Sequence, residues 1–158
     1  MGDACRISSE AMVDAMSASS PGVSEHLLDA TLEYGMRARG GKFHAYPPVV
    51  AGGARANTLH YVANDKHVLS GEMVLIDAGT EYRGYAGDIS RTWPVNGRYS
   101  DAQREVYEAV LRVQTECIAM CRPGASFAEL HRASEVATAR ELADLGQWKK
   151  KATTYLIL

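Results

Sequence analysis

The sequence has few cysteines and no long hydrophobic run. Its 158 residues include only three cysteines, Cys5, Cys117 and Cys121, which form an odd and scattered set. Such a set argues against a framework of paired disulfides and favours a reducing compartment. No apolar stretch approaches the roughly 20 residues that a helix needs to cross a bilayer. We therefore expect no membrane partner.

An excess of charge of one sign is lacking as well. The 17 Lys and Arg residues nearly balance the 19 Asp and Glu residues, which leaves a formal net charge of −2. This balance gives no electrostatic reason to expect nucleic acid or an anionic membrane surface as a partner. The first ten residues, MGDACRISSE, have neither the apolar core of a secretory signal nor the arginine-rich composition of a transit peptide. We expect no targeting segment in this chain.

The composition is that of an ordinary globular protein. Hydrophobic residues make up 46% of the chain and charged residues 23%. The length fits one domain, or a piece of a larger one.

Helical periodicity and end signals predict two helices in the first part of the chain, over 4–18 and 23–39. Ser8 or Ser9 is expected to cap the first, and Gly40-Gly41 to end the second. Residues 57–62 (NTLHYV) have a β-like composition, so we expect His60 to lie in an extended segment.

Two further helices are predicted after Gly97. The pairs Ser100 with Gln103 and Ser126 with Glu129 have the spacing of capping boxes, and each precedes an amphipathic stretch.

Two aspartates stand out between these helical regions. The apolar run Met73–Ile76 predicts a buried strand that ends in Asp77, and a second extended piece carries Asp88 eleven positions later. If the two pieces pair as a hairpin, both carboxylates can lie on one face. A carboxylate at the end of a buried strand needs donors or a cation, and Mn, Mg or Ca suit oxygen ligands. Aspartates beside glycines are also common as turn-formers or helix caps, so the spacing alone leaves both interpretations open.

Four longer motifs carry a family resemblance. They are YPPVVAGGARANTLHYVAND (46–65), GEMVLIDAG (71–79), GYAGDISRTWPVNGRYSDAQREVYEAVL (84–111) and RPGAS (122–126). They resemble the Xaa-Pro aminopeptidases, the aminopeptidase P group of the pita-bread metallopeptidases, and in particular the mitochondrial-type Xaa-Pro aminopeptidase 3 branch. The resemblance extends from about Ala4 to Gly146. It implies an α+β fold, a curved and mostly antiparallel sheet backed by helices, with residues 1–146 as a partial catalytic domain and 147–158 as a divergent tail.

The resemblance also implies a site. Family members hold two divalent metal ions, commonly manganese, with five ligands. Asp77 matches the first ligand and Asp88 the second, which bridges both ions. His60 matches a histidine that contacts the substrate and helps to move protons, so it is the expected catalytic and substrate-binding residue. The implied reaction removes the N-terminal residue from peptides with proline in second position, and the implied location is mitochondrial or else cytoplasmic.

The remaining metal ligands are not found. The family's ligand histidine and two glutamates belong to later motifs, and the only histidine after Asp88 is His131, in a predicted helix. We therefore expect a truncated chain that holds at most one weakly bound ion and has little or no activity. The alternative is a non-catalytic pita-bread module that binds another protein, and a homodimer is left open.

Overall fold

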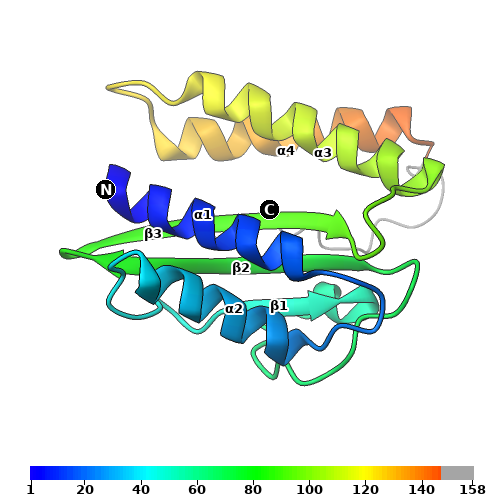
Figure 1. Ribbon diagram of the computed structural model, residues 1–158. Coiled ribbons are helices and arrows are strands. Elements are labelled where there is room, and N and C mark those ends of the chain that lie inside the picture. The colour runs from blue at the N-terminus through cyan, green and yellow to red at the C-terminus, as the bar shows by residue number, and fades with distance from the viewer. Residues whose placement is uncertain (147–158) are drawn as a thin grey trace. The chain divides into compact units, whose positions relative to one another are not determined.

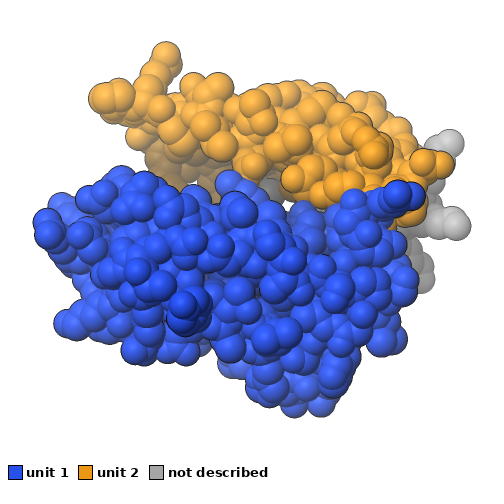
Figure 2. Space-filling model, viewed as in Figure 1, with its two compact units in different colours: residues 1–98, 157–158 blue, residues 99–156 orange. Residues whose placement is uncertain are grey.

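The computed structural model describes residues 1–146, and the expected divergent tail, 147–158, lies outside the described residues. The described residues fall into two compact units, 1–98 and 99–146 (Figure 2). In chain order the elements are α1 (Gly2–Ala18), α2 (Glu25–Ala38), β1 (Val49–Gly52), the 3-10 helix η1 (Gly53–Asn57), β2 (Met73–Tyr82), β3 (Tyr85–Pro94), α3 (Asp101–Met120) and α4 (Phe127–Asp144) (Figure 1).

The first unit is built on a three-stranded antiparallel sheet in the order β1-β2-β3. A two-residue turn joins β2 to β3, and its residues Arg83 and Gly84 have φ values of 52° and 82°. Positive φ at both central positions is the geometry of a type I′ hairpin turn, whose twist matches that of the paired strands. The helix-backed antiparallel sheet confirms the expected α+β class.

Helices α1 and α2 cover one face of this sheet (Figure 1). Residues Val74, Ile76 and Ala78 alternate along β2 and are fully buried, so this face of the strand points into the core. Each fully buried valine or isoleucine contributes about 1.5–3 kcal/mol relative to an exposed one. The other buried core residues are Ile7, Ala11, Met12, Ala15, Val23, Leu28, Leu32, Met36, Val50, Val68 and Val95.

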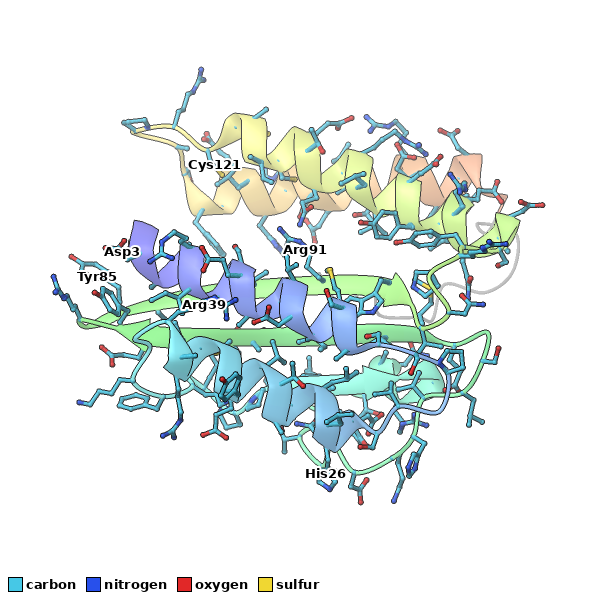
Figure 3. All side chains as sticks on the ribbon, viewed as in Figure 1. Asp3, His26, Arg39, Tyr85, Arg91 and Cys121 are labelled. Atoms are coloured by element: carbon cyan, nitrogen blue, oxygen red, sulfur yellow. The ribbon has the colours of Figure 1, made fainter. Side chains whose placement is uncertain are left out.

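Arg39, just after α2, ties the two helices together. Its guanidinium lies against α1 (Figure 3), where Nη1 donates to Asp14 Oδ2 at 2.6 Å and Nε donates to Glu10 Oε2 at 2.9 Å. Gly40 follows with φ of 89°, which confirms that the glycine pair ends α2. The helix begins two residues later than expected, because Ser24 caps it by accepting the Leu27 N–H.

Of the two serine caps expected at α1 and α4, the first was wrong and the second is confirmed in position only. Helix α1 already begins at Gly2, so Ser8 and Ser9 lie inside it, and the buried Ser8 hydroxyl accepts the backbone N–H of Thr80 at 3.0 Å. At α4, Ser126 is the N-cap residue but makes no side-chain cap hydrogen bond. The Ser100 capping box at α3 is confirmed, with bonds in both directions between Ser100 and Gln103.

The extended segment expected over 57–62 was wrong as well. Residues 53–57 form η1, and a turn follows in which Tyr61 N–H donates to Thr58 O at 3.2 Å. His60 has a φ of 53°, outside the β region. Local turn bonds and tertiary contacts here outweigh a β-like composition, which is a weak determinant of structure.

The second unit is described over 99–146 as the helical hairpin of α3 and α4. Arg112 donates twice to Glu141 Oε2, at 3.0 and 2.7 Å, and Arg140 donates to Glu116 at 2.8 Å. These bonds join the two helices. Within residues 1–146, no helix is long and apolar enough to span a membrane.

Candidate metal and substrate site

The β2–β3 hairpin brings the two predicted aspartates to the same face of the sheet. Asp77 lies opposite Ser90 and Asp88 lies opposite Gly79, so the two carboxylates are diagonal neighbours across the strand pair. Their β2 neighbours Ile76 and Ala78 point the other way, into the core. The prediction that a hairpin would place both carboxylates on one face is confirmed.

A tyrosine hydroxyl connects these two carboxylates. Tyr46 Oη lies 2.7 Å from Asp77 Oδ1 and 2.7 Å from Asp88 Oδ1, so the two carboxylate oxygens lie within twice that distance of each other. A hydroxyl has a single hydrogen and can donate to only one of them at a time. The two carboxylates can therefore accept more hydrogen bonds than Tyr46 supplies.

Strand β1 determines the position of Tyr46. Tyr46 lies three residues before Val49, and Val49 is paired with Asp77 on β2. Burial raises the pKa of Tyr46 strongly, and the acceptors Asp88 and Asp77 raise it further. The hydroxyl thus stays protonated and acts as a donor at any physiological pH. The sequence alone does not reveal this role of Tyr46, because only the β1–β2 register shows that the segment before β1 reaches the carboxylates.

The carboxylate oxygens of Asp77 and Asp88 suit a hard divalent cation as ligands, but they are few. Asp77 is partly buried and Asp88 is exposed, so solvent and ions reach the pair. Oxygen ligands are those that Mn, Mg and Ca prefer. In the part of the chain that the structure describes, no group of three or more His, Cys, Asp or Glu residues could hold a metal ion. Two carboxylates can hold one ion with water in its other positions, whereas a two-metal cage needs more ligands than these.

His60 is placed in the turn after η1, and its side chain is exposed. It does not join Asp77 and Asp88 in a group of metal-binding residues. The structure thus brings the two predicted metal ligands together, whereas His60, the predicted substrate-binding residue, is not grouped with them. The neighbouring residue Tyr61 anchors this turn through its hydroxyl, which donates to Glu25 Oε2 at 2.8 Å.

Comparison with known proteins gives consistent results. The model of metallopeptidase family M24 matches residues 1–156. Xaa-Pro aminopeptidase 3 of Rattus norvegicus is 48% identical over 141 residues, which cover 89% of this chain and 28% of that protein. The mitochondrial intermediate cleaving peptidase 55 of Arabidopsis thaliana is 39% identical over 127 residues, 80% of this chain and 26% of that protein.

A solved structure shares the fold. The aminopeptidase PepP of Pseudomonas aeruginosa superimposes with a TM-score of 0.89 at 40% sequence identity, covering 92% of this chain and 33% of that chain. This chain therefore spans only about a quarter to a third of the length of these relatives.

Proposed function

Because this chain belongs to metallopeptidase family M24, we propose that it supplies the Asp77, Asp88 and His60 part of an Xaa-Pro aminopeptidase site. The proposed whole-protein reaction removes the N-terminal residue from peptides with proline in second position. Proline suits selection by a shaped pocket, since its ring fixes φ and an X-Pro amide has no N–H. The observation that supports the proposal most is the convergence of both carboxylates on one hydroxyl.

In this proposal Asp77 and Asp88 are ligands for a divalent metal ion, most simply manganese. Two partly solvated carboxylates held within reach of one atom repel each other, and a cation relieves that repulsion. A metal-activated water is the nucleophile that such an ion supplies to a hydrolase. This chain's own residues hold the ion and present His60 to the substrate.

The activity of this chain alone is proposed to be very low. One ion held by two carboxylates has open, water-filled positions, and catalysis by a metal pair needs both ions in fixed geometry. We expect the purified chain, incubated with Mn²⁺ and an X-Pro peptide, to release no more free N-terminal amino acid than Asp77→Ala does. Turnover that Asp77→Ala abolishes would contradict this.

A non-catalytic interaction module is the second candidate. It is favoured by one observation, the absence of any group of three metal-binding residues among residues 1–146. The two candidates differ in metal binding. A folded chain whose melting temperature does not respond to millimolar Mn²⁺ favours the interaction module, because a ligand that binds only the native state must raise that temperature.

The proposed location is mitochondrial or cytoplasmic, supported by the mitochondrial name of the Arabidopsis thaliana relative. A homodimer is a further proposal, and size-exclusion chromatography with light scattering tests it.

A further inference from the structure

Glu25 is a fully buried acidic residue in the first turn of α2, with 0% of its surface exposed. A buried carboxylate is costly unless hydrogen-bond donors surround it. Such a residue identifies a place where the fold has to provide several donors at fixed positions. The source of those donors shows what the carboxylate holds in place.

Four donors satisfy the two oxygens of Glu25. Oε1 accepts the Gly52 N–H at 2.8 Å and Arg55 Nε at 2.7 Å, while Oε2 accepts the Tyr61 hydroxyl at 2.8 Å and the Lys66 N–H at 3.0 Å. Burial raises the pKa of Glu25, and these four bonds lower it by more, so the net pKa lies below its ordinary value. The carboxylate is therefore ionised and fully used as an acceptor.

All four donors come from one segment, 52–66, and none comes from α2 itself. Two lie at its start, one lies beside His60 and one lies at its end. The backbone of Glu25 adds a fifth bond, since its N–H donates to Lys66 O at 2.8 Å. Capping of α2 is done instead by Ser24, which accepts the Leu27 N–H. The bonds of the Glu25 side chain thus fix the 52–66 segment and do not cap the helix.

We propose that Glu25 is a positioning residue that holds His60 in place by clamping both ends of the 52–66 segment and the Tyr61 hydroxyl. His60 sits directly before Tyr61, in the turn closed by the bond from Tyr61 N–H to Thr58 O. The positive φ of His60 is unfavourable for a non-glycine residue. Without the bonds to Glu25, the turn can therefore relax away from this conformation. The role of His60 toward substrate rests on the proposed function, whereas the clamp rests on the hydrogen bonds alone.

Tyr61→Phe is the sharpest test in the full chain, because it removes one hydroxyl beside His60 and leaves three bonds to Glu25. The measurements are the NMR signals of the His60 imidazole and hydrogen exchange of the amides of 53–66. We expect the His60 signals to shift or broaden, and the exchange of these amides to rise at least tenfold. The signals of His26 and His131 and the exchange of β2 and β3 should stay unchanged. Tyr34→Phe is the matched control, since Tyr34 lies on α2 and is 75% exposed.

Two results would overturn the proposal. One is a Tyr61→Phe chain whose His60 signals and 53–66 exchange match the wild type. The other is exchange that rises equally in the segment and in β2–β3, which indicates a merely structural bond. The amide nitrogen in Glu25→Gln cannot accept a hydrogen bond, so this variant should show larger changes than Tyr61→Phe. If it fails to fold, the Tyr61→Phe result decides. Neither readout uses metal or peptide, so failure of the proposed function leaves this test intact.

Discussion

At the scale of single residues, Glu25 differs from Asp77 and Asp88 in how many hydrogen-bond donors surround its carboxylate. Glu25 is buried, and four donors satisfy it completely. Asp77 and Asp88 instead share one hydroxyl, that of Tyr46, on a face that solvent reaches. A complete donor shell holds structure in place, whereas an incomplete one leaves room for a cation. This contrast separates the structural carboxylate from the candidate ligands.

Stability should fall in acid through Glu25. Because the pKa of Glu25 in the folded chain lies below its ordinary value of 4.5, its contribution is present above that value and is lost as pH falls through the lower, folded pKa. Urea unfolding from neutral pH to about pH 3 should show this decline. The decline should be shallower in Glu25→Gln. An equally steep decline in that variant would assign the acid sensitivity to other carboxylates.

Tyr46→Phe should destabilise the metal-free chain by about 1–2 kcal/mol, because it removes the donor shared by two carboxylates. Millimolar Mn²⁺ should then stabilise the variant more than it stabilises the wild type, since the cation replaces the lost donor. Urea unfolding with and without Mn²⁺ measures both effects, with Tyr34→Phe as the control for loss of an exposed hydroxyl. An Mn²⁺ effect that is equal in Tyr46→Phe and wild type would show that the hydroxyl and the ion do not share the site.

At the scale of elements, local signals predicted what local physics determines. The glycine pair after α2 and the Ser100 capping box each act within a few residues, and both predictions are confirmed. The apolar run before Asp77 does form a strand, but β2 continues to Tyr82 and does not end at Asp77 as predicted. The extended segment 57–62 and the cap at Ser8 were wrong, and Ser126 is the N-cap residue of α4 without the predicted side-chain bond. The first two depend on partners far along the chain, Glu25 for the segment and Thr80 for Ser8, which periodicity cannot show. Nothing in the structure explains why the Ser126 side chain makes no cap bond.

The packing of α1 on β3 depends on the lack of a side chain at Gly87. A β-carbon there would collide with the backbone carbon and oxygen of Ala4, and backbone cannot move aside as a flexible side chain can. We expect Gly87→Ala to cost about 1–3 kcal/mol of unfolding free energy, as overpacking does. Gly2→Ala is the matched control, because a β-carbon at Gly2 has nothing within 4 Å. Equal midpoints of urea unfolding for the two variants would contradict the close approach.

At the scale of the whole molecule, the resemblance read from four motifs is confirmed as membership of metallopeptidase family M24. Long motifs singled out Asp77 and Asp88 as candidate ligands, because the two strands that carry them and the turn between lie together in sequence. Tyr46 and Glu25 escaped notice, since their partners lie 31 to 42 and 27 to 41 positions away. Such contacts are set by sheet register and helix packing, which a single sequence does not specify.

The central claim is that Asp77 and Asp88 form one shared site for a divalent cation. Isothermal titration of the chain with Mn²⁺ tests it most directly, with Asp77→Asn and Asp88→Asn as variants and Asp3→Asn as the control for loss of one exposed negative charge. We predict one ion per chain with a dissociation constant of about 1 mM, weakened at least tenfold in either site variant and unchanged in Asp3→Asn. Wild-type affinity in both site variants, or no binding by the wild type, would contradict the account.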